Sequence, residues 1–293
     1  AKIVDIRAGR ITEALGAGKV PVVAGFQGVS TERDVTTLGR GASDLTAVAL
    51  AAVLEADVCE IYTDVTGVFS ADPRIEPDAH KLSRLSFAEM LEISAAGGRV
   101  LQLRSAELAR NHHVPMHVRS SFTWEPGTWI VEEDEEMEQA VVTAVVHDAT
   151  LAKITVAGVP DKPGVAARLF RALADHTVNV DDIVQNVSVH GTTDISFTVP
   201  RSDVARAIEG VSGHLSDLGA KDVTSDEGIA KVSVIGAGMK SHPGVTATMF
   251  ETLAEEGINI DLISTSTIRI SCIVREEDVE RAVRSLHRAF GLS

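Results

Sequence analysis

Cysteine is scarce in this chain, whose 293 residues include only Cys59 and Cys272. Two cysteines so far apart in the sequence can build neither a disulfide framework nor the closely spaced ligand set of a structural zinc site. Their scarcity is typical of a protein kept in a reducing compartment.

Basic residues are also too few for binding to a polyanion. The chain has 27 Lys and Arg against 42 Asp and Glu, which gives a formal net charge of −15. Binding to nucleic acid or to an anionic membrane surface needs clustered Lys and Arg. The charge therefore argues against both kinds of partner.

No hydrophobic run is long enough to cross a bilayer. The longest, LTAVALAAVL at 45–54, falls well short of the roughly 20 residues that a spanning helix needs, so it predicts a buried helix. The first residues, AKIVDIRAGR, lack the basic and apolar regions of a signal peptide. We therefore expect a cytoplasmic protein with no membrane partner.

The composition, 44% hydrophobic and 24% charged, is that of an ordered protein, and the length suggests two or three domains. The acidic run EEDEEME at 132–138 is typical of a solvated linker, and we place a domain boundary there.

Strand and helix patterns alternate before this acidic run. Apolar runs predict strands at 20–26, 57–63 and 114–121, and helical spacing predicts helices at 43–56, 86–96 and 98–111. Ser43 is expected to cap the first of these helices. The alternation favours a mostly parallel sheet covered on both faces.

An internal repeat organises the rest of the chain. The segment DKPGVAARLFRALADHTVNVDDIVQN at 161–186 aligns with SHPGVTATMFETLAEEGINIDLISTS, which lies 80 residues later. Each copy predicts a strand, a Pro-Gly turn, a helix, two strands and a final helix. The strands are expected at 153–159, 193–200, 231–238 and 267–274, and the final helices at 202–215 and 276–290.

The Pro-Gly turn precedes a helix N-terminus, whose free N–H groups and dipole suit the α-carboxylate of an amino acid. The ammonium group would then be received, or the adjacent loop ordered, by Asp161, Asn179, Asp181 and Gln185. Alternatively, Pro-Gly only turns the chain and Asn179 caps a strand, and the repeat alone favours neither interpretation. Two copies imply a pseudo-symmetric pair with a ligand pocket at its interface.

Two motifs before the acidic run suggest the binding of an anion. In TTLGRGASD (36–44), Gly39 and Gly41 permit a close backbone approach and Arg40 offers a fork for a carboxylate or phosphate, although an ordinary Gly-rich turn would look similar. In YTDVTGVFSADPR (62–74), polar residues follow a strand end. There Asp64 and Asp72 could bind ribose, or Mg²⁺ through water, although Asp-Pro and Thr-Gly are also common loop formers.

These motifs, together with ADVCEIYTDVTGVFSADPR, LSFAEMLE, DKPGVAARLFRALAD and ISTSTIRIS, resemble the aspartate kinases of the amino-acid kinase family. The repeats resemble tandem ACT domains, regulatory modules that bind amino acids. The resemblance covers essentially the whole chain. It implies an α/β fold: the C-terminal part of an amino-acid kinase three-layer sandwich (1–131), an acidic linker (132–148), and two ferredoxin-like βαββαβ ACT domains (149–226 and 227–293).

The family phosphorylates the β-carboxylate of L-aspartate with ATP and Mg²⁺, which begins lysine, threonine and methionine biosynthesis, and lysine or threonine commonly inhibits it. Because the acceptor carboxylate is already ionised at neutral pH, no general base is needed. The alternative is a non-catalytic regulatory subunit that binds lysine or threonine. A kinase for glutamate or acetylglutamate fits less well, because of the tandem ACT pair.

The resemblance also assigns residues. Arg40 and Asp44 match catalytic positions, and the substrate loop is Arg40, Gly41, Ala42 and Ser43. The nucleotide site is Thr63, Asp64, Phe69, Ser70, Asp72, Arg74 and Arg99. The effector residues are Asp161, Pro163, Gly164, Val165, Ala166, Asn179, Val180, Asp181, Gln185, Thr192, Thr193, Ser241, His242, Pro243, Gly244, Val245, Asn259, Ile260, Thr265 and Ser266. We expect the effector between the two ACT domains, with each Pro-Gly turn facing the other domain, and a homo-oligomer or pairing with a full-length copy through 149–293.

The sequence departs from the family pattern in several places. Nothing matches the family's N-terminal Lys-x-Gly-Gly motif, and Arg99, Ala42 and Thr267 stand where Lys, Gly and Glu are usual. Three explanations fit the first departure: further residues preceding this sequence, an internal translation start, or a non-catalytic paralogue. We favour the first.

Overall fold

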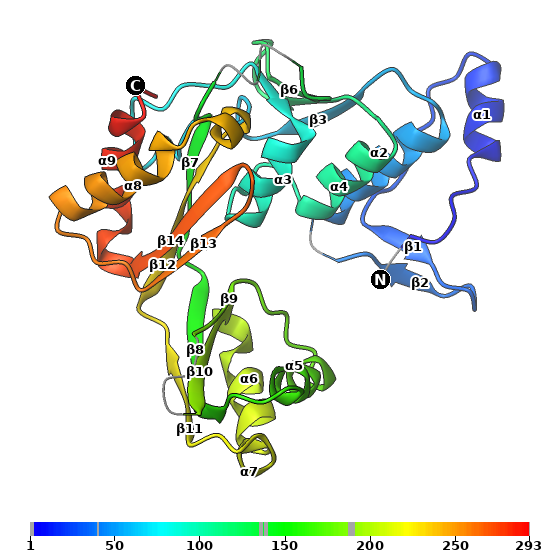
Figure 1. Ribbon diagram of the computed structural model, residues 1–293. Helices are drawn as coiled ribbons and strands as arrows, with labels where there is room; N and C mark the ends of the chain where they lie inside the picture. Colours follow the sequence, from blue (N-terminus) through cyan, green and yellow to red (C-terminus); the bar gives the residue numbers. More distant parts are fainter. Residues whose placement is uncertain (1–2, 40, 135–136, 138–139, 187–190, 293) are drawn as a thin grey trace.

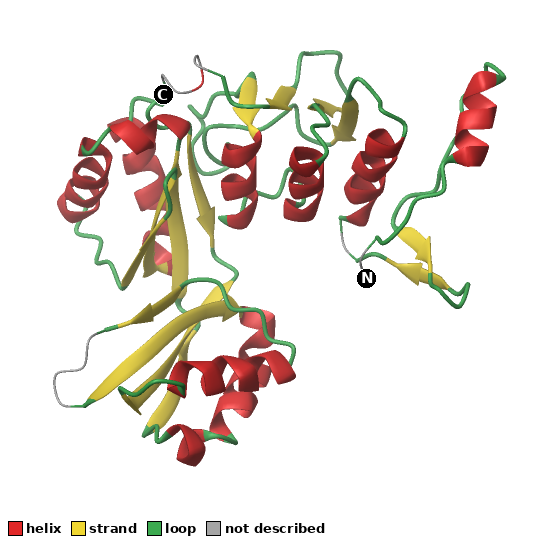
Figure 2. Ribbon diagram, turned by 45° about the vertical axis from the view of Figure 1, so that its right-hand side comes forward, coloured by secondary structure: helices red, strands yellow, loops and turns green. Residues whose placement is uncertain are grey.

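The computed structural model describes residues 3–39, 41–134, 137, 140–186 and 191–292. Within these ranges the chain forms three four-stranded sheets and one small two-stranded hairpin. Figure 1 shows the sheets one after another along the chain, and Figure 2 shows most helices beside the four-stranded sheets, with α1 standing apart. No helix in these ranges has the length and apolar character that a membrane span requires.

The front portion of the chain, residues 3–131, contains the first sheet and the hairpin. Its elements are α1 (Gly9–Gly16), β1 (Gln27–Val29), β2 (Val35–Thr37), α2 (Ala42–Val53), β3 (Cys59–Thr63), β4 (Arg84–Ser86), α3 (Phe87–Ala95), α4 (Leu103–Asn111), β5 (Met116–Ser120) and β6 (Thr128–Val131).

The front sheet has the strand order β3-β5-β6-β4 and mixed strand directions. Strands β3 and β5 run parallel, as do β4 and β6, but β5 and β6 are antiparallel. The sheet is therefore mostly parallel, as predicted, with one antiparallel pair at its centre. The cause is the short connection between β5 and β6, which permits only a hairpin, whereas a parallel pair needs a long crossover.

Helix starts in the front portion follow two different local rules. Helix α3 begins at the predicted place because Ser86 caps it: its hydroxyl accepts from the Glu89 N–H, and the Ser86 N–H donates to the Glu89 carboxyl. Helix α2 begins instead after Gly41, whose φ of 72° is left-handed, so Ser43 is not its cap. The helix was predicted correctly and its capping residue was not.

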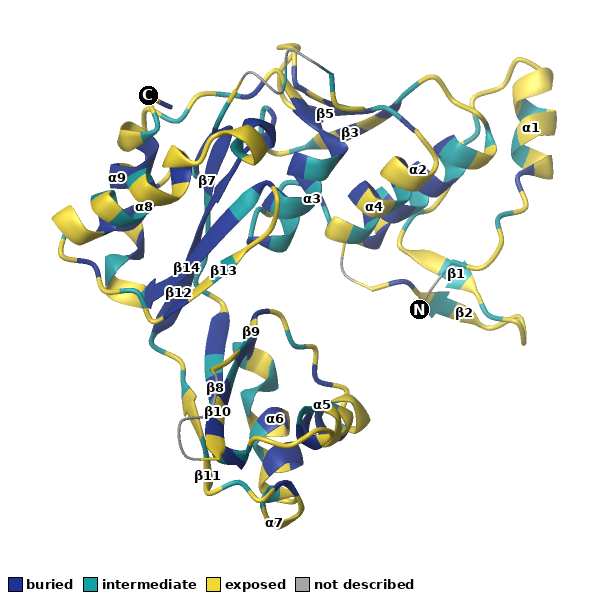
Figure 3. Ribbon diagram, viewed as in Figure 1, coloured by how far each residue is buried: buried dark blue, intermediate teal, exposed yellow. Residues whose placement is uncertain are grey.

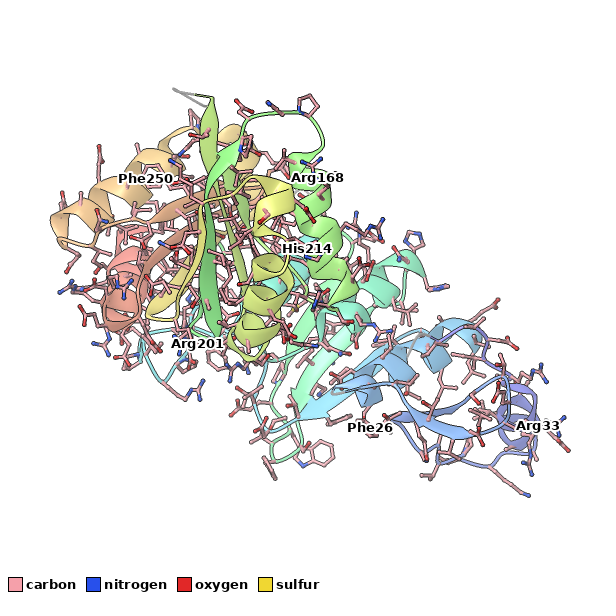
Figure 4. The ribbon with its side chains drawn as sticks, turned by 90° about the horizontal axis from the view of Figure 1, so that it is seen from below. Phe26, Arg33, Arg168, Arg201, His214 and Phe250 are labelled. Atoms are coloured by element: carbon pink, nitrogen blue, oxygen red, sulfur yellow. The ribbon has the colours of Figure 1, made fainter. Side chains whose placement is uncertain are left out.

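The expected strand at 20–26 does not form. This segment has no strand partner among the described residues, and Val20, Val22, Val23 and Phe26 are exposed. Figure 4 shows Phe26 and Arg33 in the front portion, apart from the region that carries Arg201 and Phe250. An apolar run becomes a buried strand only where neighbouring strands complete its hydrogen bonds, which is not a local property.

The repeats form the other two sheets. Their elements are β7 (Ala144–Asp148), β8 (Leu151–Pro160), α5 (Val165–Asp175), β9 (Ile183–Gln185), β10 (Thr192–Pro200), α6 (Val204–Ser212), α7 (Leu215–Leu218), β11 (Asp222–Asp226), β12 (Ile229–Ile235), α8 (Gly244–Glu255), β13 (Leu262–Thr265), β14 (Arg269–Arg275) and α9 (Val279–Ala289). Every strand and helix predicted for the repeats is present, with ends shifted by a few residues.

The two repeat sheets are completed by different segments of the chain. The first module, β8 to β11, has the order β11-β8-β10-β9, so its own last strand pairs with its first. The second module has the order β13-β14-β12-β7, and its outer strand β7 precedes the first module in the sequence. Residues 144–148, expected to be linker, are therefore a strand, and the first module is inserted into the second.

Strand β7 also joins the second module to the front portion. In the second module's core, Val145 packs with Val232 and Val234, and also with Ala71 and Ile75 from the front portion. On the opposite side of the sheet, Ala144 and Ile235 belong to the core of the front sheet. Figure 3 shows β12 and β14 as a largely buried pair. The first module, by contrast, has a core of its own residues.

The two modules meet through an approximate two-fold arrangement. The starts of β8 and β12 lie together in an apolar cluster that contains Leu151, Ile229, Leu262 and Ile273. On either side of this cluster lies an ion pair: Lys153 with Asp261 at 2.8 Å, and Lys231 with Asp181. The two lysines occupy nearly equivalent places in the repeats and the two aspartates equivalent ones, so each module gives one charge of each sign.

Within one chain the Pro-Gly turns do not face each other. Because β8 and β12 meet at their starts, the turns that follow their far ends lie at opposite ends of the module pair (Figure 1). Residues 161–164 and 241–244 are exposed there. The expected facing arrangement was therefore wrong for a single chain.

The inter-module ion pairs lead to a stability prediction. Lys231 is fully buried, so Asp181→Ala should lower the free energy of unfolding in urea by about 3 kcal/mol, because a buried ammonium loses its partner. This loss lies at the lower end of the range for breaking a buried ion pair, because the Asp182 carboxylate still lies 3.6 Å from the Lys231 ammonium group.

The equivalent change Asp261→Ala is the matched control. Its partner Lys153 is partly exposed and can return to water, so the loss should stay below about 1 kcal/mol. Equal losses in the two variants would contradict this account of the interface.

Candidate nucleotide and substrate site

A cavity of about 780 Å³ lies where the front sheet meets β7, a size within the range of small-molecule sites. Six of the seven predicted nucleotide residues line it, from two separate segments, 63–74 and 97–100: Thr63, Asp64, Phe69, Asp72, Arg74 and Arg99. The structure thus brings together residues that the sequence assigned to one function.

The loop 64–74 forms one wall of the cavity and is held by the front sheet. Its backbone crosses closely over β6, where the Thr128 hydroxyl accepts the Val68 N–H at 2.8 Å. Gly67 has a φ of 152°, and a Cβ there would lie 2.6 Å from the Thr128 Oγ1. Only glycine fits this approach, which sets the path of the loop.

The cavity contains paired and unpaired charge. Asp72 accepts hydrogen bonds from the Arg74 side chain, the shortest at 2.6 Å, and these bonds lower the pKa of the Asp72 carboxyl. Arg99, on the opposite wall, has no ion-pair partner among the residues that the structure describes. It is therefore the cation best placed to meet an anionic ligand.

Ser70 does not line the cavity, contrary to the prediction. It is fully buried, with its Oγ 2.9 Å from the His287 Nε2 on α9, and it accepts the His80 N–H. Its carbonyl accepts the Val145 N–H of β7 at 2.7 Å. Ser70 thus fixes the loop to the second module.

One wall of the cavity was not predicted from the sequence. Val145, Val146, His147 and Ala149 line the cavity from β7 and the residue that follows it. The available signal was the apolar stretch VVTAVV at 141–146, which follows the acidic run. Its position in a presumed linker hid the strand.

The predicted substrate loop lies beside the cavity but not on its walls. Arg40 lies outside the described residues, whereas Gly41, Ala42, Ser43 and Asp44 form the start of α2. Asp44 accepts a hydrogen bond from the Gln102 backbone, and burial raises the pKa of its carboxyl. Since Gln102 follows the cavity-lining residues Arg99 and Val100, one short segment connects the two places.

Most predicted effector residues lie on the surface of the modules. Gly164, at a φ of 89°, ends the first turn and precedes α5, and Asn179, Gln185 and Asn259 are exposed. Several others are engaged within the chain: Asp181 pairs with Lys231, the Thr193 hydroxyl donates to the Asn186 carbonyl, and the Ser266 hydroxyl donates to Glu92 of α3. No enclosed effector pocket joins the two turns in the described segments of one chain.

Comparison with known proteins agrees with this arrangement. Residues 1–120 match the amino acid kinase family, and residues 154–215 and 232–290 match ACT domains. An aspartokinase of Mycolicibacterium smegmatis is 56% identical over the whole chain, which spans 70% of that relative. The chain belongs to the aspartokinase family.

Solved aspartokinases share the fold. Escherichia coli aspartokinase III in complex with aspartate and ADP (R-state) superposes with a TM-score of 0.77 and 28% identity, over 90% of this chain and 59% of that one. Its complex with lysine and aspartate (T-state) gives a TM-score of 0.72 and 29% identity, over 91% of this chain and 59% of that one. As an aspartokinase, the chain is a kinase with two ACT domains, and its function belongs to amino-acid biosynthesis.

The buried link between Ser70 and His287 predicts a pH dependence of stability. Burial lowers the pKa of His287 below its value of about 6.5 in an unfolded chain. Its contribution is therefore fully present above about pH 6.5 and is lost as the pH falls through the lower, folded pKa.

His287→Gln should reduce the slope of unfolding free energy against pH below about 6.5 by up to about 1.4 kcal/mol per pH unit. Urea unfolding at a series of pH values measures this slope. His112→Gln, at an exposed position, is the control. A slope in His287→Gln that matches the wild type would contradict the assignment.

Proposed function

We propose that the cavity binds ATP and that the start of α2 binds L-aspartate, so that the γ-phosphoryl group passes to the aspartate β-carboxylate. The observation that carries this proposal is the convergence of Thr63, Asp64, Phe69, Asp72, Arg74 and Arg99 on one cavity of nucleotide size. In this proposal, the kinase portion spans residues 1–131, and the ACT domains lie within 149–226 and 227–293, with β7 added to the second.

The reaction requires that negative charge be neutralised and that the two substrates be positioned. It does not require the removal of a proton. Aspartate arrives ionised, so the enzyme must hold two anions together and neutralise the phosphoryl group in transfer. Arg99 and Arg74 would meet the phosphates. The start of α2 offers free N–H groups to an anionic substrate.

Mg²⁺ fits the cavity as a companion of the nucleotide. Asp64 and Asp72 both line it, and Mg²⁺ is usually held by one or two carboxylates together with phosphate oxygens. No cluster of three His, Cys, Asp or Glu side chains suited to a metal occurs in the described ranges, which agrees with an ion that arrives with ATP. The ion would supply charge neutralisation at the phosphates.

Lysine or threonine is the proposed effector, and its site is proposed to include residues of a second chain. The two Pro-Gly turns lie at opposite ends of one chain's module pair, so a pocket between turns needs another module. The exposed residues Asp161, Gln185 and Asn259 are available for such pairing. A homo-oligomer, or a pair with a longer copy, would supply it.

A regulatory subunit without catalysis is the second candidate. It predicts amino-acid binding without nucleotide binding, so titration of the chain with MgATP, lysine and threonine separates the two candidates.

Arg99→Ala should weaken MgATP binding by tenfold or more, about the worth of a hydrogen bond to a charged group. Isothermal titration calorimetry of the chain measures this loss. Arg99→Lys, which keeps the charge, should lose less, and Arg171→Ala on α5 should bind as the wild type does. Unchanged affinity in Arg99→Ala would remove Arg99 from the nucleotide site.

Asp161→Ala should weaken binding of the inhibitory amino acid by about tenfold, because its carboxylate is proposed to meet the ammonium group. Calorimetry with lysine and with threonine measures the affinity, and sedimentation at micromolar concentration measures assembly. The matched control is Asp217→Ala, on α7 of the same module. Equal affinity of Asp161→Ala and the wild type would argue strongly against this placement.

A further inference from the structure

Strand β7 belongs both to the sheet of the second module and to the wall of the cavity. All five residues of β7 pair with β12 in the second module, and three of them, Val145, Val146 and His147, also line the cavity. The Val145 N–H is bonded to the Ser70 carbonyl in the loop of the opposite wall. A strand of the regulatory sheet is therefore held at the proposed nucleotide site.

His147 is the polar side chain that this strand brings to the cavity. The charges of Asp72, Arg74 and Arg99, all cavity-lining, act on its imidazole, as does that of its neighbour Asp148. Strand alternation places its side chain on the same face as Val145, which packs with Ala71 of the loop 64–74.

The imidazole is available to a ligand. Burial lowers the pKa of His147, so the ring is neutral near pH 7 and keeps one N–H donor and one acceptor nitrogen. Neither nitrogen bonds to another residue in the described ranges of the chain, and His147 is one of the residues that line the cavity.

The position of His147 is fixed by a close backbone approach. A Cβ at Gly97, where φ is 110°, would lie 2.4 Å from the His147 carbonyl oxygen. Glycine therefore lets the segment that carries Arg99 pack directly on β7, which places the guanidinium and the imidazole on adjoining walls.

We propose that His147 is a nucleotide-binding residue, whose imidazole N–H donates to an oxygen of the ribose–phosphate moiety of bound ATP. The charged neighbours Asp72, Arg74 and Arg99 mark this as the polar end of the cavity, whereas Val68, Ile93 and Val100 offer an apolar wall for the base. Through this bond the second module contributes directly to nucleotide affinity. The inference rests on the proposed nucleotide site and adds a residue to it.

The test is calorimetric titration of the chain and its variants with MgATP. His147→Ala should bind about tenfold more weakly than the wild type, and His147→Gln, which keeps an N–H donor, should recover some of the loss. Asp148→Asn is the matched control, because it is the next residue of β7 and does not line the cavity, and it should bind normally.

Hydrogen exchange gives a second readout that a purely structural role would not produce. MgATP should slow amide exchange in 144–148 of the wild type, and this added protection should be lost in His147→Ala while exchange without nucleotide stays the same. If His147→Ala fails to fold, His147→Gln, with smaller changes in the same directions, carries the comparison.

The outcomes distinguish the role of His147 from the existence of the nucleotide site. Wild-type binding of MgATP with unchanged affinity and protection in the His147 variants would overturn the role of His147 and leave the nucleotide site intact. Absence of MgATP binding by the wild-type chain would overturn both.

Discussion

The pairing of β7 with β12 is the constraint on which the rest of the molecule depends. Without it, the second module would have three strands, and the buried strand β12 would leave a row of N–H and C=O groups unpaired, which is costly. The strand that satisfies them comes from before the first module, so the second module closes only when the chain has passed through the first. The same strand carries the Val145 N–H to Ser70 and so ties the regulatory sheet to the loop of the proposed nucleotide site.

Near β7, side chains of local motifs also bond the kinase portion to the second module. Glu89 completes the capping box of α3, yet its carboxyl group also accepts the Thr143 hydroxyl at 2.6 Å and the Ala237 N–H at 3.3 Å. A buried carboxyl group needs several donors, and Ala237 of the second module and Thr143 just before β7 provide two of them. The Arg284 side chain of α9 likewise donates to the Ile75 carbonyl, just beyond the loop 64–74. The second module therefore holds both helix α3 and the end of the loop 64–74 in the kinase portion.

The first module is attached differently. It keeps a core of its own and meets the second through the starts of β8 and β12, two ion pairs, and Arg201, which bonds Glu276 at 2.7 Å. Arg201 also donates to the Leu151 and Ile229 carbonyls, one from each module. The second module is packed against both the first module and the kinase portion, and its strand β7 lines the cavity.

The sequence by itself determined the repeat and most of its strands and helices. Those features are local: spacing, turn residues and the order of motifs specify them, and even the Ser86–Glu89 cap is readable from four residues. It did not determine which strand completes which sheet, since pairing joins residues that are distant in the chain and depends on both partners. Hence 144–148 was taken for linker and 20–26 for a strand. Only the tertiary structure decided that β7 belongs to the second module. An edge strand is assigned to a sheet by the neighbouring strand with which it shares backbone hydrogen bonds, and here that neighbour is β12.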